Sequence, residues 1–357
     1  MTIGWQLRAL ALWSAAAVLV ANGPARADDP RSRLSQVRSW GYQLSNLDIE
    51  KLAASPYDLL VIDYSRDGSD EAALRPAELA RLQRKPDGSR RIVLAYLSIG
   101  EAETYRYYWQ SAWGDLWRIP NVWSSPHWRA SRNDEWRDNY AVRYWDPDWQ
   151  SILLGKGGYL DRILKAGFDG VWLDKVDSSS ESVAKGRPTA RSDMIALVRR
   201  IAEHGRRQRR GFLVVPQNGE ELLEDAAYRG IIDGFGKEDL LFGETVSGKP
   251  NPEEQIAARS ALIESIRSEG KPVLAVEYLI DRPMIDRARQ RLASLGYIPH
   301  FADRELADLR IGDYPGSTAG KRGRRSPESP NSLPLIVAVA LALLALLFLV
   351  RRRTGAR

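Results

Sequence analysis

Short apolar runs of four to seven residues recur along the chain and limit its fold most strongly. They cover residues 40–43, 59–63, 92–98, 170–174, 212–217, 230–235, 272–278 and 297–301. Segments between some of them, such as MIALVRRIAEHG after Asp193, repeat apolar residues at helical spacing. Strands alternating with helices indicate a parallel sheet, and eight such strands favour a closed (β/α)8 TIM barrel. A doubly wound open sheet of six strands is the alternative, because the first, sixth and eighth runs are the weakest.

The ends of the chain predict export and a membrane anchor. Arg8 precedes an apolar stretch and Ala25-Arg26-Ala27 resembles a cleavage site, so residues 1–27 are predicted to be a signal peptide. Residues 333–350 carry no charge and precede three arginines, which predicts a transmembrane helix and a basic cytoplasmic tail at 351–357. Residues 312–332 read as a flexible linker. The barrel domain, residues 28–311, is then expected to lie outside the cytoplasm and to be anchored to the membrane.

The charge of the chain argues against nucleic acid as a partner. The net charge is +6, of which residues 320–357 contribute +7 and residues 1–27 contribute +2, which leaves −3 for residues 28–319. A mildly acidic domain lacks the basic surface that nucleic-acid binding requires. The chain has no cysteine, and His127, His204 and His300 are far apart in sequence. We therefore expect no metal site and no cofactor, and we expect the histidines to lie on the surface or in loops.

Polar residues follow directly after several apolar runs. In a TIM barrel the carboxyl ends of the strands form the active-site rim, so charges at these positions are placed where substrate binds. The residues concerned are Asp63, Glu101, Asp174, Lys175, Asp177, Asn218, Glu220, Glu238, Glu277 and Tyr278. Each alone is equally explained as a helix cap or an ion-pair partner, and Glu101 in particular is a candidate partner of Arg106. Together they favour a single site.

Residues 101–150 are rich in aromatic side chains and follow the third strand. Eight of the twelve tryptophans are here: Trp109, Trp113, Trp117, Trp123, Trp128, Trp136, Trp145 and Trp149. Rigid aromatic faces stack on sugar rings, while carboxylates and amides bind the hydroxyl groups, so the rim suits a saccharide. About half of these rings are expected to pack the insertion instead. Trp109, Trp113 and Trp117 have the spacing of one helix face and are assigned to packing.

Three motifs resemble glycoside hydrolase family 114, a TIM-barrel family also described as endo-α-1,4-polygalactosaminidases. They are YLSIGEAETYRYYW at residues 96–109, GFDGVWLDKVD at 167–177 and PQNGEELL at 216–223. The likeness extends over about residues 40–301. It implies hydrolysis of α-1,4 bonds in a galactosamine-containing polysaccharide by two carboxylates.

The resemblance also assigns residues. The strand-four aspartate of the family falls on Asp174 in LDKVD and its strand-six glutamate on Glu238 in GKED, with Asp239 or Glu277 as alternatives to Glu238. We assign Asp174 as nucleophile or base and Glu238 as general acid. Carboxyl groups ~5 Å apart would indicate retention and groups ~6.5–9.5 Å apart inversion, so the stereochemistry stays open.

The remaining rim residues are candidates for substrate binding. A galactosamine unit carries an ammonium group, which matches a surplus of acids. The expected substrate-binding residues are Tyr42, Asp63, Tyr96, Glu101, Lys175, Asp177, Asn218, Glu277 and Tyr278. Two other functions stay open: a non-catalytic protein that binds or senses polysaccharide, and a hydrolase of a different α-linked glycan.

Overall fold

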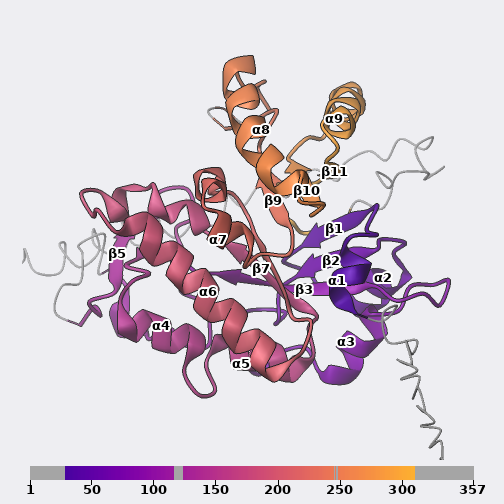
Figure 1. The fold of residues 1–357 in the computed structure, drawn as a ribbon. Coiled ribbons are helices and arrows are strands. Elements are labelled where there is room, and N and C mark those ends of the chain that lie inside the picture. The colour runs from indigo at the N-terminus through magenta and orange to yellow at the C-terminus, as the bar shows by residue number, and fades with distance from the viewer. Residues whose placement is uncertain (1–28, 116–123, 245, 247, 310–357) are drawn as a thin grey trace, which may run out of the picture. The chain divides into compact units, whose positions relative to one another are not determined.

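The computed structural model describes residues 29–115, 124–244, 246 and 248–309. These residues belong to one compact unit, Met1–Gly316. Its parallel strands are β1 Trp40–Gln43, β2 Leu59–Ile62, β3 Ile92–Ser98, β7 Gly170–Asp174, β8 Leu213–Pro216, β9 Phe235–Glu238, β10 Val273–Glu277 and β11 Ile298–Phe301. The helices are α1 Pro30–Leu34, α2 Ile49–Ala54, α3 Pro76–Leu82, α4 Pro147–Leu154, α5 Tyr159–Ala166, α6 Ala190–Gln208, α7 Ala226–Arg229, α8 Glu253–Arg267 and α9 Arg282–Ser294. Strands and helices alternate along the chain as predicted (Figure 1).

The parallel strands form two sheets. One has the order β1-β2-β3-β7-β8 and the other the order β11-β10-β9. Between β8 and β9 there is only an isolated bridge, Gln217 to Gly236. Between β1 and β11, side chains replace the backbone ladder: the indole N–H of Trp40 donates to the Ile298 carbonyl (2.9 Å), and His300 Nε2 accepts from the Tyr42 amide (3.3 Å). His300 is therefore a buried strand residue, and its expected place on the surface or in a loop is wrong.

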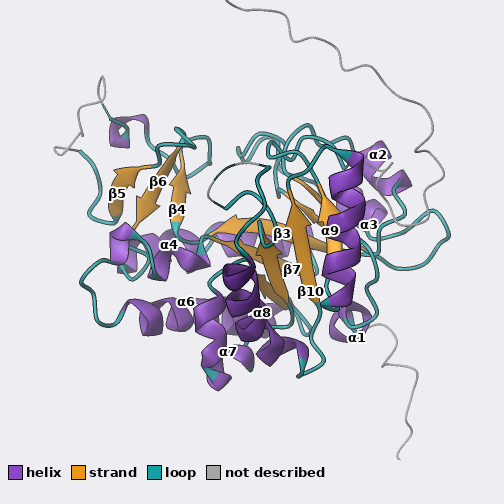
Figure 2. Ribbon diagram, turned by 90° about the horizontal axis from the view of Figure 1, so that it is seen from above, coloured by secondary structure: helices purple, strands orange, loops and turns teal. Residues whose placement is uncertain are grey.

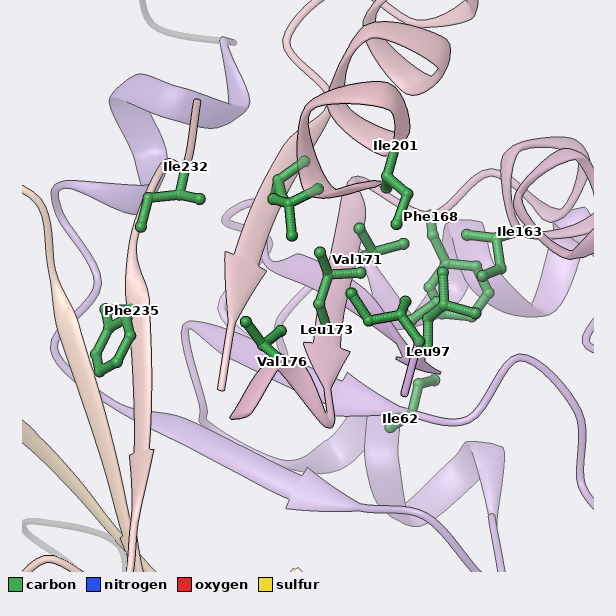
Figure 3. Packing of buried hydrophobic residues seen from close by; sticks show 14 of the residues in the cluster. Ile62, Leu97, Ile163, Phe168, Val171, Leu173, Val176, Ile201, Ile232 and Phe235 are labelled. Carbon is green, nitrogen blue, oxygen red and sulfur yellow. The ribbon is translucent and has the colours of Figure 1, made fainter. Parts of the chain in front are cut away.

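Both sheets nevertheless share one inner hydrophobic cluster. Alternate residues of six strands contribute to it: Trp40, Tyr42, Leu59, Val61, Ile92, Leu94, Tyr96, Trp172, Leu213, Val215, Leu274 and Val276. The other residues of the strands face the helices, so that Leu97 and Leu173 lie with Ile163 of α5 and Ile201 of α6 (Figure 3). This two-residue alternation is what a sheet curved around its own interior requires.

The predicted fold class is corrected in two respects. The eight strands do not form one closed ladder. Inside them, Trp40 and Trp172 pack with centroids 5.1 Å apart, and the Trp172 ring lies against Gly236 next to the β8–β9 bridge. The transmembrane helix is not supported either, because no helix in the described part of the chain is long and apolar enough to cross a membrane. Residues 333–350 lie outside that part, as do residues 1–27, for which the signal peptide stays a prediction.

The sixth strand was predicted in the wrong place. Residues 230–234 form a turn after α7, and β9 begins only at Phe235. Ile231 and Ile232 are buried in this turn, which explains why an apolar run occurs there without a strand. The strand itself reads FGKE, and its charged residues concealed it.

The aromatic insertion forms a separate antiparallel sheet of β4 Glu101–Glu103, β6 Asn139–Val142 and β5 Arg129–Arg132 (Figure 2). Most of its described tryptophans pack against each other, as Trp109 with Trp113 and Trp113 with Trp128. Trp109 and Trp113 pack as expected, but within residues 109–115 only the 3-10 turn Ser111–Trp113 is helical, so no helix runs through both tryptophans. Trp117 and Trp123 lie outside the described residues.

Candidate active site

A cleft of about 710 Å³ lies at the carboxyl ends of the strands. It is lined by Tyr42, Asp63, Tyr96, Glu101, Asp174, Lys175, Asp177, Glu238 and Tyr278, nine of the eleven residues predicted for the site. A second cavity of about 680 Å³ adjoins it and shares Asp177, Glu238, Glu135 and Arg304 with it. We call these the first and the second lobe. Asn218, another predicted residue, lines the second lobe.

Asp174 ends β7 and is held by three hydrogen-bond donors. Its Oδ2 accepts from the Tyr96 hydroxyl (2.7 Å), and its Oδ1 accepts from Gln217 Nε2 (2.9 Å) and from the Lys175 amide (2.8 Å). Gln217 is oriented in turn by the Trp172 indole N–H, which donates to its Oε1 (2.8 Å). Three donors fix the carboxyl group and favour its ionised form.

Glu238 ends β9 and lines both lobes. Its Oε2 accepts from the Tyr278 hydroxyl (2.9 Å), and its Oε1 accepts from Asn218 Nδ2 (2.8 Å). Asn218 Oδ1 accepts in return from the Glu238 amide (3.3 Å) and from Lys237 Nζ (3.1 Å). Asn218 therefore fixes both the backbone and the side chain of Glu238.

The carboxylates of the cleft perturb one another. Burial raises the pKa of Asp174 to about 8, and the negative charge of Glu238 adds to this effect. Burial likewise raises the pKa of Asp177 to about 7; the nearby Lys175 opposes the rise, and Glu181 and Glu238 add to it. Two groups that repel each other in a site of low polarity retain a proton near neutral pH. Such a pair can supply both the acid and the base of a hydrolysis.

Two predicted residues lie in charge networks. Glu101 accepts from Asn133 (2.9 Å) and Asn139 (3.1 Å) and lies 3.6 Å from Lys175 Nζ, so it is neither a partner of Arg106 nor a helix cap. Asp63 pairs with Arg106 (2.7 Å). Both carboxylates are buried at the wall of the first lobe, and their oxygens already have donors.

Glu277 is placed away from both lobes. Its side chain is fully buried, and its carboxylate accepts from the Leu241 (2.8 Å) and Phe242 (3.1 Å) amides. Burial raises its pKa to about 8. It supports the loop after β9 and does not face substrate. Asp239 lines the second lobe and pairs with Arg304 (2.7 Å).

Sequence reasoning missed several lining residues. Gln217 contacts Asp174 directly and stands in the quoted motif PQNGEELL, so its place after a strand was a usable signal. Tyr105 and Trp136 line the first lobe and are 47% and 42% exposed, unlike the packed rings of the insertion. Arg304 follows the last strand, and its guanidinium lies 4.4 Å from the Tyr278 ring centroid. Nothing in the local sequence distinguishes Arg304 from the other arginines.

The family model of glycoside-hydrolase family GH114 matches residues 21–321 of this chain. The chain belongs to this family. The hydrolase is 35% identical over 285 residues to an uncharacterized protein of Methanocaldococcus jannaschii, covering 76% of this chain and 77% of that one. It is also 35% identical over 283 residues to an uncharacterized protein of Deinococcus radiodurans, covering 77% and 83%.

Two solved structures share its fold. One is the glycoside hydrolase domain of PelA from Pseudomonas aeruginosa, with a TM-score of 0.57 and 23% identity over 76% of this chain and 97% of that one. The other is Ega3 of Aspergillus fumigatus in complex with galactosamine, with a TM-score of 0.55 and 16% identity over 76% and 93%. The hydrolase therefore has an α/β fold with barrel-like relatives, despite the openings between its two sheets.

Proposed function

We propose that the hydrolase cleaves α-1,4 bonds in a galactosamine-containing polysaccharide, with Asp174 as base or nucleophile and Glu238 as general acid. The observation that carries the proposal is the meeting of these two carboxyl groups in one cleft, each oriented by a tyrosine and a side-chain amide. Glycosidic cleavage requires one protonated and one ionised carboxyl group on either side of the scissile bond.

The assignment of acid and base rests on the hydrogen bonds of the two groups and on their places in the cleft. Three donors converge on Asp174 and favour its carboxylate form, which suits a base or nucleophile. Glu238 lines both lobes, so its proton can reach a glycosidic oxygen that lies between them. Asp239 and Glu277 suit the role of acid less, since Asp239 is paired with Arg304 and Glu277 lies outside the cleft.

The charge of the cleft supports an amino-sugar substrate. Among the described residues, ten Asp and Glu side chains line the first lobe: Asp63, Asp67, Glu101, Glu103, Glu135, Asp138, Asp174, Asp177, Glu238 and Glu305. Four basic side chains accompany them: Arg66, Arg137, Lys175 and Arg304. A surplus of acids attracts a polymer with free ammonium groups. That Ega3 was solved with galactosamine agrees with this substrate class.

The proposed site of action is outside the cytoplasm. The support is the signal-like pattern of residues 1–27. N-terminal sequencing of the protein recovered from the exported fraction would test it, and a start at Asp28 is expected.

The substrate is tested by incubating the hydrolase with α-1,4-linked galactosamine polymers of graded acetylation and measuring new reducing ends. We expect release to rise with the fraction of free amines and to fall at high salt, because screening weakens the attraction of the cleft. An unrelated α-linked glucan serves as the control. Release from the glucan alone would make the chain a hydrolase of a different α-glycan, and binding without release would favour the non-catalytic alternative.

A further inference from the structure

Lys175, the residue directly after Asp174, has an unusual backbone conformation. Its φ is +61°, in the left-handed region that lysine rarely occupies. This turn directs the Lys175 amide back onto Asp174 Oδ1 (2.8 Å). The turn also packs closely on the preceding loop, since a Cβ at Gly100 would lie 2.4 Å from the Lys175 carbonyl oxygen. A strained residue next to a catalytic group persists only where its surroundings hold it.

The side chain of Lys175 is held from two sides. Its Nζ pairs with Glu181 (2.5 Å) and lies 3.6 Å from Glu101 Oε1. Ser178 Oγ donates to the second oxygen of Glu181 (3.0 Å). The ammonium is thus held by one acid from the segment after β7 and one from the insertion sheet.

The insertion sheet sets the position of Glu101. Glu101 begins β4 and Asn139 begins β6, and the two strands are paired. Asn139 Nδ2 and Asn133 Nδ2 each donate to one oxygen of the Glu101 carboxylate (3.1 and 2.9 Å). A chain of polar contacts therefore runs from the sheet through Glu101 and Lys175 to Asp174.

We propose that Lys175 is a positioning residue: its amide orients Asp174, and its ammonium group, held by the insertion sheet through Glu101, favours the carboxylate form of Asp174. The proposal rests on the proposed role of Asp174. Four carboxyl groups bear on Lys175 or on Asp174: Glu101 from β4, Asp177 and Glu181 from the segment after β7, and Glu238 from β9. Asp177, Glu101 and Glu181 raise the pKa of Lys175 above its ordinary value although burial lowers it, so the amine keeps its charge.

The test is a carbon-13 NMR titration of the aspartate carboxyl groups, in which the Asp174 signal is assigned by its loss in Asp174→Asn. Lys175→Met removes the charge, and Lys175→Gly removes it while permitting the left-handed turn. We expect the Asp174 midpoint to move to higher pH in both variants, because the neighbouring charge no longer favours the carboxylate. Lys175→Arg is expected to restore it. An unchanged midpoint in both the Met and the Gly variants would overturn the proposal.

A matched control is Lys85→Met, because Lys85 also bridges two acids, Asp58 (2.9 Å) and Asp87 (3.6 Å), outside the cleft. It should leave the Asp174 midpoint unchanged. Asn139→Ala tests whether the insertion sheet contributes, since it removes one hydrogen bond to Glu101 without altering any charge. We expect a smaller shift of the Asp174 midpoint to higher pH. An unchanged midpoint would show that the insertion sheet does not act on Asp174.

Activity gives a second readout. In Lys175→Met and Lys175→Gly, the acid limb of the pH profile of kcat/KM should shift to higher pH. On that limb, kcat/KM falls about tenfold for each pH unit below the midpoint. The NMR titration needs no glycan. If the polymer is not cleaved but Asp174 shifts, the proposed function fails and the effect of Lys175 on Asp174 stands.

Discussion

Replacing the proposed base should make the protein more stable while it abolishes activity. Asp174→Asn removes a buried charge that faces Glu238 and Asp177. The amide keeps the shape of the carboxyl group: its oxygen can accept from Gln217 and from the Lys175 amide, and its NH2 can donate to the Tyr96 hydroxyl. The variant therefore removes repulsion, although the Tyr96 hydroxyl loses Asp174 Oδ2 as its acceptor.

The size of the effect follows from proton linkage. The pKa of Asp174 rises from 3.8 to about 8, so the folded protein binds this proton more tightly than the unfolded chain. Its contribution to stability is complete below pH 3.8 and is lost as the pH rises through 8. At about 1.4 kcal/mol per pKa unit, the loss is at most about 6 kcal/mol. The repulsion belongs to both carboxylates, and the surroundings rearrange when one of them is replaced. We therefore expect the free energy of unfolding to rise by only about 2 kcal/mol for Asp174→Asn at alkaline pH.

Thermal unfolding at pH 5, 7 and 9 measures this gain. A gain of about 2 kcal/mol corresponds to a rise in Tm of roughly 5 °C for a domain of this size. The difference between variant and parent should be smallest at pH 5 and largest at pH 9. A difference that does not grow with pH, or a variant less stable than the parent at pH 9, would refute the reasoning.

Glu78→Gln is the opposite control. The hydrogen bond from Arg75 lowers the pKa of Glu78 to about 2, so its carboxylate stabilises the folded protein above the unfolded pKa and stops doing so in acid. This variant should lose stability at pH 7 and at pH 9. Opposite signs for the two substitutions would exclude a general effect of removing one negative charge.

Three further results are expected. Tyr278→Phe removes the hydroxyl that donates to Glu238 and should lower kcat about ten- to a hundredfold with KM little changed in the reducing-end assay, whereas an unchanged kcat would remove Tyr278 from the mechanism. Trp136→Ala should raise KM about tenfold and preserve kcat, because an exposed ring binds substrate and transition state alike; a selective loss of kcat would contradict this. Lys237→Met leaves the buried Glu220 unpaired and should lower the free energy of unfolding in urea by about 3–5 kcal/mol at pH 7, and by less in acid where Glu220 is protonated.

Much of the fold could be predicted because buried strands appear in the sequence as short apolar runs. The runs at residues 40–43, 92–98 and 170–174 coincide with β1, β3 and β7. Strand β9 could not be found in this way, because it carries Lys237, which is buried only by virtue of its partners Glu220 and Asn218. A buried ion pair depends on residues far apart in the chain, and no local pattern reveals it.

The breaks between the two parallel sheets could not be predicted from the sequence either. Apolar alternation predicts that a strand faces a core, but it does not tell whether neighbouring strands share a ladder. Here side-chain hydrogen bonds of Trp40 and His300 join β1 and β11 where a ladder was expected, and Trp172 packs against Gly236 next to the β8–β9 bridge. These are three-dimensional packing effects, so the barrel-like arrangement could be predicted, but the breaks in its ladder could not.

The site was partly predictable because strand ends converge. Asp174 and Glu238 meet at one cleft, as position after a strand indicated. The same rule misled for Glu277, whose carboxylate turns into the protein to bind two amides of the loop after β9. A position at the rim predicts proximity to the site, but the direction of the side chain depends on the unpaired backbone groups nearby.

The central claim is that Asp174 and Glu238 act together as the catalytic pair. Its most direct test is the release of reducing ends from partly deacetylated α-1,4-galactosamine polymer by the parent, Asp174→Asn and Glu238→Gln, with binding of the polymer measured alongside. We expect the parent to cleave, and each variant to bind the polymer but to lose cleavage by at least about a thousandfold. Near-parental cleavage by either variant would contradict the account.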